Sequence, residues 1–241
     1  MKDAVNSNHI LPDTWCDHLL RWLLPSYCLA CNEPGHQGKT LCATCQLLLP
    51  RMENACLRCA APLKELEGIH PTCGPCLYDP PPLETAHAAF LYHWPINKLI
   101  SRFKFHQDLA CGHLLADNMA MAAQHWPRPQ ALVPVSLHHG RLRTRGYDQA
   151  LELARHVGNR LQLPCLPALR RVRATLPQSQ LNANKRRSNL HNAFIPIHPL
   201  PAHVALVDDV MTTGTTLHAA ARALRHTGVT RIDAWICARV P

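Results

Sequence analysis

The residues in this chain best suited to chemistry are paired cysteines. Eight of the 12 cysteines form four C-x-x-C pairs: Cys28/Cys31, Cys42/Cys45, Cys56/Cys59 and Cys73/Cys76. Two thiolates on one turn converge on a tetrahedral ion, so in a cytoplasmic chain such pairs indicate zinc rather than disulfides. Pairing in chain order closes each ribbon with a short loop, and a crossed arrangement of the first pair with the third is the alternative. We therefore predict two structural zinc ions.

The last pair also allows a redox interpretation. Cys73-Gly74-Pro75-Cys76 has the form of a thiol–disulfide active site, whose first cysteine needs the N-terminus of a long helix to lower its pKa. Asp79 and three prolines follow almost at once, and proline prevents such a helix. Zinc is the favoured interpretation.

A pair of acids forms the second constellation. Asp208 and Asp209 follow the apolar run Val204–Val207, which predicts a strand with two solvated carboxylates at its carboxyl edge, where open α/β sheets bind ligands. The next residues are Thr212, Thr213, Gly214, Thr215 and Thr216. A Thr/Gly turn that opens into a helix presents backbone N–H groups to an anion. The pattern indicates a sugar phosphate, with the phosphate on the turn and the ribose hydroxyls on the acids; a Thr-rich helix cap is the alternative.

Alternating strands and helices must position these groups. We expect strands at 86–92, 131–135, 204–207 and 232–237, and helices at 95–105, 109–125, 148–161 and 215–226. The helix 148–161 should bury Leu151, Ala154, Val157 and Leu161. Residues 176–188 are polar, basic and aperiodic, which predicts a loop. Such alternation predicts an α/β fold with a mostly parallel sheet and helices on both faces.

Composition changes along the chain predict three segments. Residues 1–27 read as a tail and an amphipathic helix, 28–82 as the double zinc ribbon with a proline linker, and 83–241 as the α/β domain. No apolar run reaches the roughly 18 residues of a membrane span, and no secretory signal is visible. We expect a cytoplasmic protein without membrane insertion. The formal net charge, 25 − 16 = +9, favours polyanionic partners.

Several motifs together carry a family resemblance. The run Val204–Thr216 resembles the 5-phosphoribosyl 1-diphosphate motif of type I phosphoribosyltransferases. The segments Val133–Ser136, Arg141–Ala150 and Arg173–Leu181, with the double zinc ribbon ahead of them, resemble the ComF/GntX family over about residues 16–241.

The resemblance implies roles for particular residues. Asp208 and Asp209 would bind the ribose hydroxyls of phosphoribosyl diphosphate, and Thr212 to Thr216 its 5-phosphate, with Mg²⁺ bridging ligand oxygens. Ser136 and the turn around it would approach the diphosphate, with Arg141, Arg143 or Arg145 as charge partners. The implied catalytic residues are Asp208, Asp209 and Arg173, the last on a loop that would close over the site together with Lys185, Arg186 and Arg187.

Two functional hypotheses follow from this resemblance. The first is a phosphoribosyltransferase-like protein that binds phosphoribosyl diphosphate with Mg²⁺ and takes part in DNA uptake or utilization, as in competence. No acceptor motif is readable, so the residues do not decide whether a pentosyl group is transferred. The second is a non-catalytic accessory protein that binds single-stranded DNA and keeps a vestigial or sensing sugar-phosphate pocket. Both admit DNA and DNA-processing proteins as partners.

Overall fold

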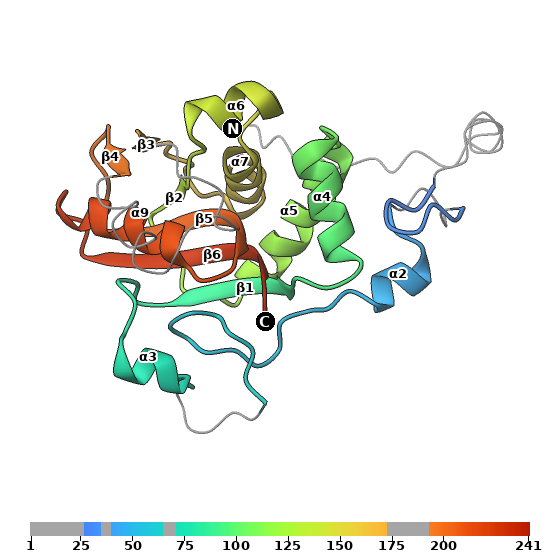
Figure 1. Ribbon diagram of the computed structural model, residues 1–241, viewed down its shortest axis with the longest axis horizontal. Helices are drawn as coiled ribbons and strands as arrows, with labels where there is room; N and C mark the ends of the chain where they lie inside the picture. Colours follow the sequence, from blue (N-terminus) through green and yellow to red (C-terminus); the bar gives the residue numbers. More distant parts are fainter. Residues whose placement is uncertain (1–26, 35–39, 65–70, 173–192) are drawn as a thin grey trace, which may run out of the picture. The chain divides into compact units, whose positions relative to one another are not determined.

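Figure 1 shows a computed structural model that describes residues 27–34, 40–64, 71–172 and 193–241. The chain divides into two compact units, residues 1–48 and 49–241. The predicted helix before Tyr27, the predicted loop 176–188 and the site residue Arg173 lie outside the described residues. In the first unit, helix α2 spans Ala43–Leu47.

The second unit is built on a parallel sheet. Its strands are β1 (Ala86–Leu91), β2 (Ala131–Pro134), β5 (His203–Met211) and β6 (Arg231–Arg239). They pair in parallel in the order β1-β6-β5-β2 (Figure 1). The residues Val204–Val207 of β5 are fully buried, because a central parallel strand is covered on both faces. The predicted α/β fold with a mostly parallel sheet is confirmed.

Helices cover both faces of this sheet. The helices α4 (Ile96–Phe105), α5 (Leu109–Ala123), α7 (Gln149–Leu161) and α9 (Thr215–Arg225) agree with the predicted helices to within a few residues. Val204 and Leu206 of β5 share a core cluster with Leu217 of α9. Successive strand residues point to opposite faces, so Ala205 and Val207 point to the face where α5 and α7 pack.

Some elements differ from the predictions. Helix α6 (His139–Arg145) and the antiparallel pair β3 (Leu169–Arg171) and β4 (Phe194–Pro196) were not predicted. The predicted apolar face of α7 is wrong in part: Leu151 and Leu161 are half-buried, while Ala150 and Leu153 are buried. Residues 150, 153, 154 and 157 also share a helical face, and this is the face that packs on the sheet.

The third and fourth cysteine pairs belong to the second unit. The fourth pair belongs to α3 (Gly74–Tyr78), with Cys73 as its N-cap and Cys76 inside the helix. Between the third and fourth pairs, Ala60 is fully buried in the same core cluster as residues of β5 and α9. The N–H of Ala86 at the start of β1 donates to Leu57 O at 2.8 Å. This part of the predicted ribbon module is therefore joined to the sheet. Among the described residues, no helix has the length and apolar character needed to cross a membrane.

Candidate functional site

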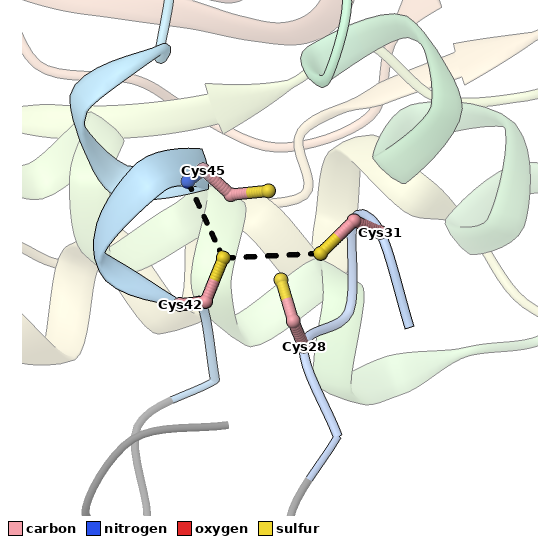
Figure 2. Close-up of side chains that lie close together, drawn as sticks. All are labelled: Cys28, Cys31, Cys42 and Cys45. Carbon is pink, nitrogen blue, oxygen red and sulfur yellow. Dashed lines mark hydrogen bonds between the residues drawn. The ribbon is translucent and has the colours of Figure 1, made fainter. Parts of the chain in front are cut away.

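The eight paired cysteines form two four-sulfur clusters. Figure 2 shows the cluster of the first unit, with the four sulfur atoms turned toward one another. Within each cluster all sulfur atoms lie within 4.8 Å of one another, and the members are Cys28, Cys31, Cys42 and Cys45 in one and Cys56, Cys59, Cys73 and Cys76 in the other. The structure thus groups the pairs in chain order and not in the crossed order.

The spacing of the sulfur atoms fits zinc. The Cys31 and Cys42 Sγ atoms are 3.8 Å apart, and the Cys59 and Cys73 Sγ atoms are 3.7 Å apart. Four sulfur atoms bound at about 2.3 Å to one tetrahedral ion lie about 3.8 Å from each other. Four cysteine thiolates are the ligand set of a closed structural zinc site.

Backbone N–H groups favour the thiolate form of one cysteine in each cluster. Burial raises the pKa of Cys28, but N–H groups of Cys31, Cys42 and Ala30 outweigh it and lower the pKa to about 6. Cys56 behaves in the same way, with a pKa lowered to about 7, and its Sγ accepts from the N–H of Cys73 at 3.3 Å. Thiolates are the form that binds metal.

Helix α3 separates the zinc interpretation from the redox one. Cys73 is its N-cap, and the helix has only five residues, ending at Tyr78 before Asp79. A single turn lacks the long aligned dipole that activates a redox cysteine. The grouping of Cys73 and Cys76 with Cys56 and Cys59 is therefore consistent with a zinc site rather than with a redox pair.

The acid pair lies further inside the sheet than predicted. Strand β5 continues to Met211, paired with β6 throughout, whereas its pairing with β2 ends at Val207. Asp208 and Asp209 thus lie beyond the end of β2 but still beside β6. Asp209 is only 8% exposed, so the expectation of solvated carboxylates is wrong for it: the Nζ atom of Lys104 from α4 lies 2.9 Å from its Oδ1.

The two carboxylates have different surroundings. Burial, followed by repulsion from the Asp209 carboxylate, raises the pKa of Asp208 to about 8. The Asp208 Oδ1 accepts from the N–H of Asp209 at 2.9 Å. Asp209 has Lys104 as a direct ionic partner. A pair of this kind can hold one proton. When that proton leaves, the two carboxylates can bind a cation or accept hydrogen bonds from sugar hydroxyl groups.

The Thr/Gly turn after β5 forms a small hollow, here called the phosphate cradle. Asp208, Thr212, Gly214, Thr215 and Thr216 all line it. Gly214 is the N-cap of α9 with φ +74°, so no side chain caps the first-turn N–H groups. A Cβ on Gly214 would lie 2.4 Å from Met211 Cε and 2.7 Å from His218 Nε2. Thr213 is exposed, with its hydroxyl 2.6 Å from that of Thr215.

Beside the cradle lies a cleft of about 120 Å³, here called the central cleft. Asp208 and Thr216 belong to both hollows. The charged residues that line the central cleft are Asp208, Asp209, Lys104, Arg141, Arg145 and Arg171. Four cations against two acids give a positive surplus, which suits a ligand with more than one phosphate.

The position of each arginine on helix α6 determines whether it lines the central cleft. Arg141 and Arg145 are four residues apart and therefore share one helical face, and both line the cleft. Arg143 is exposed and is not among the lining residues. Gly146, with φ +81°, closes the helix. The half-buried Asp148 accepts from the N–H of Leu137 at 2.8 Å and of Leu151 at 3.1 Å, which fixes the loop before α6 to the start of α7.

Ser136 and Lys104 both depart from the predicted site. Ser136, expected at the diphosphate, donates its hydroxyl to Leu169 O at 2.8 Å, and the cleft is lined by its neighbours Val135 and Leu137. Lys104 lines the cleft but was not predicted. Because β1 and β2 are parallel, the chain between them must return from the carboxyl edge of the sheet to its amino edge. Two helices connect these strands, and α5 alone, about 22 Å long, is long enough for this return. The end of α4, with Lys104, therefore stays at the carboxyl edge. The two predicted helices between these strands were the signal that could have indicated this.

Known proteins resemble this chain over most of its length. Residues 19–77 match the family model of the double zinc ribbon domain. Competence protein F of Haemophilus influenzae is 35% identical over 224 residues, 88% of this chain and 96% of that protein. DNA utilization protein YhgH of Salmonella typhi is 31% identical over 233 residues, 90% of this chain and 98% of that protein.

A more distant relative extends the same family. Competence protein ComFC of Bacillus subtilis is 27% identical over 223 residues, 83% of this chain and 89% of that protein. These similarities cover both the cysteine pairs and the sheet that carries the acid pair. The chain belongs to the ComF/GntX family of competence and DNA utilization proteins.

Proposed function

We propose that the phosphate cradle and the central cleft bind 5-phosphoribosyl 1-diphosphate with Mg²⁺, in the service of DNA utilization. The observation that carries this proposal is the junction of the two hollows at Asp208 and Thr216. At this junction the N-terminus of α9, which can bind an anion, lies beside two carboxylates and the cations that line the central cleft. A sugar with a phosphate at one end and a diphosphate at the other matches this order of groups.

The parts of the ligand then have separate binding groups. The 5-phosphate lies on the first-turn N–H groups of α9, and the ribose hydroxyls bind Asp208 and Asp209. The diphosphate faces Lys104, Arg141 and Arg145. Carboxylate oxygens and diphosphate oxygens are the ligands that Mg²⁺ prefers.

Transfer of the pentosyl group would use the same arrangement. As the bond between C1 and the diphosphate oxygen lengthens, its electron pair stays on the diphosphate and positive charge grows on the sugar. Cations that contact the departing diphosphate then bind it more tightly than in the ground state. In this proposal Lys104, Arg141 and Arg145, which line the central cleft, take this role.

Calorimetry tests this proposal through fragments of the ligand. Phosphoribosyl diphosphate should bind in the presence of Mg²⁺, while ribose 5-phosphate and inorganic diphosphate should each bind at least tenfold more weakly, a difference of about 1.4 kcal/mol or more. Equal affinity for diphosphate and for the whole ligand would mean that the cradle and the acids take no part.

Single-stranded DNA binding is the second candidate function. The basic wall of the cleft and the exposed Arg143 on α6 favour it, as do the names of the DNA utilization relatives. In this case the chain would bind the strand without any transfer, and the sugar-phosphate pocket would be vestigial or would sense the metabolite.

A further inference from the structure

A third hollow of about 300 Å³ adjoins the central cleft and is here called the outer hollow. Its lining residues are Lys104, Phe105, Gln107, Arg141, Thr144 and Arg145. Three of them, Lys104, Arg141 and Arg145, also line the central cleft. A ligand in the outer hollow would therefore reach the same cations as the proposed diphosphate. Its volume is at the lower end of the range for small-molecule sites, about 300–1,000 Å³.

Phe105 is an exposed aromatic residue at this position. It ends α4 and is 66% exposed. The guanidinium carbon of Arg145 lies 5.2 Å from the centre of its ring. Arg145 is itself held, because its NH1 donates to Gln149 Oε1 at 2.8 Å. An aromatic ring beside a guanidinium plane is the surface on which proteins stack flat heterocycles such as nucleobases.

The two walls of the outer hollow are tied together. The hydroxyl of Tyr147, just after α6, donates to the carbonyl oxygen of Phe103 in α4. The rings of Phe103 and Tyr147 also lie 5.4 Å apart. Phe105 and Arg145 are thus presented by two helix ends held to each other, which reduces the ordering that binding requires. The exposed Gln107 adds an amide that can both donate to and accept from a base edge.

We propose that the outer hollow is a nucleobase subsite, in which the base stacks on Phe105 and Arg145 and an attached phosphate faces Lys104 and Arg141. The proposal deepens the function proposed for the adjoining cleft and rests on it. The hollow combines one aromatic ring, three cations and one amide, which suits a flat ring joined to an anion. Two sources share this chemistry: a free nucleotide and a single DNA strand.

Two oligonucleotides of equal length and charge test the proposal on the full-length chain. At low salt the wild type should bind a short oligothymidylate about tenfold more tightly than the corresponding abasic oligonucleotide, since stacking contributes about 1–3 kcal/mol per base. Phe105→Ala should reduce this preference to less than threefold, and Phe105→Trp should retain it. Tyr78→Ala is the matched control, because Tyr78 is 95% exposed and lines none of the three hollows.

A mononucleotide arm distinguishes the sources. If thymidine 5′-monophosphate binds with the same dependence on Phe105, the source is a free nucleotide; if only the oligonucleotide does, the source is a strand. Either result supports the subsite. Equal affinity for the base-bearing and abasic strands, without Phe105-dependent mononucleotide binding, overturns it, as does failure of both probes to bind.

Titration with phosphoribosyl diphosphate and Mg²⁺ separates this proposal from the function on which it rests. Phe105→Ala should bind that ligand within twofold of wild type, which also shows that the variant is folded. If the wild type shows the base preference but does not bind phosphoribosyl diphosphate, the subsite stands and the proposed function fails. If the wild type binds phosphoribosyl diphosphate but shows no base preference, the proposed function stands and the subsite fails.

Discussion

Two adjacent aspartates with different surroundings dominate the site at the residue scale. Asp209 is neutralised by Lys104, whereas Asp208 is disfavoured as an anion by burial and by Asp209. Asp209 therefore has a lysine as its ionic partner, whereas the surroundings of Asp208 favour its protonated form. Such a difference is typical of sites that bind cations or hydroxyl groups, and it has a direct consequence for stability.

Asp208→Asn should raise stability at alkaline pH. For a carboxyl whose pKa rises from 3.8 to about 8 on folding, stability is highest below pH 3.8 and falls as the pH rises from there to about 8, where the loss is complete. The Asp208→Asn variant has no ionisable group at this position, so its stability does not fall in this way. Thermal melts should show a gain of more than about 1 kcal/mol near pH 9, since one pKa unit corresponds to about 1.4 kcal/mol, and little difference near pH 4.

Asp117→Asn is the control of opposite sign. Burial opposes the shift, but His156 and Arg160 lower the pKa of Asp117. Its contribution is therefore present at neutral pH and lost as the pH falls, so this variant should be slightly less stable at pH 7. A parallel pH profile for the two variants would contradict the account of Asp208.

Gly214→Ala should damage the phosphate cradle. Positive φ disfavours alanine by about 1–2 kcal/mol, and the new Cβ would also meet Met211 and His218. Gly228→Ala separates the two effects, because Gly228 has φ +85° but open space around it. We expect the Gly214 variant to be the less stable of the two in urea unfolding and, alone, to lose affinity for phosphoribosyl diphosphate. Equal behaviour would mean that close approach at Gly214 is unimportant.

At the scale of elements, the second cysteine cluster is joined to the sheet beside the site. Arg239 at the end of β6 donates from Nε to Cys59 O at 3.0 Å and from NH1 to Met211 O at 3.3 Å. Met211 directly precedes the Thr/Gly turn. Arg58 donates to Glu84 O at 3.0 Å, just before β1. The zinc expected between Cys56, Cys59, Cys73 and Cys76 would thereby help to hold the cradle.

Single-ligand variants of the two clusters should therefore differ. Cys59→Ser should remove one zinc, lower the melting temperature of the second unit by on the order of 10 °C and weaken phosphoribosyl diphosphate binding. Cys31→Ser, in the first unit, should also remove one zinc but leave both properties nearly unchanged. Elemental analysis, melting curves and calorimetry measure the three quantities, and identical effects of the two variants would refute the link through Arg239.

Periodicity predicted the elements that repeat a pattern, and topology explains those it missed. Strands and helices from Ala86 to Arg239 follow the alternation of apolar runs and amphipathic stretches, so their order was predictable. Helix α6 has no buried residue, so it leaves no apolar stripe to detect. Lys104 and Phe105 reach the site only through the packing of α4, and no local motif marks either residue.

At the scale of the whole molecule, charge links the small-ligand site to nucleic acid. The chain carries a formal charge of +9. Part of the positive charge lies in the central cleft, on Lys104, Arg141, Arg145 and Arg171. If the chain binds single strands, log affinity should fall with log salt at about −0.7 per phosphate neutralised. Replacing Lys185, Arg186 and Arg187 by alanine should flatten that slope equally for all sequences, as phosphate contacts do. An unchanged slope would exclude these three residues from the contact.

The most direct test of the central claim is calorimetric titration of phosphoribosyl diphosphate with Mg²⁺ into wild type and the double variant Asp208→Asn, Asp209→Asn. We expect binding to wild type, none to the double variant, and unchanged binding to Asp117→Asn, whose carboxylate lines none of the three hollows. A melting curve should show that the double variant is folded. Binding of equal strength to wild type and the folded double variant, or no binding to wild type, would contradict the account.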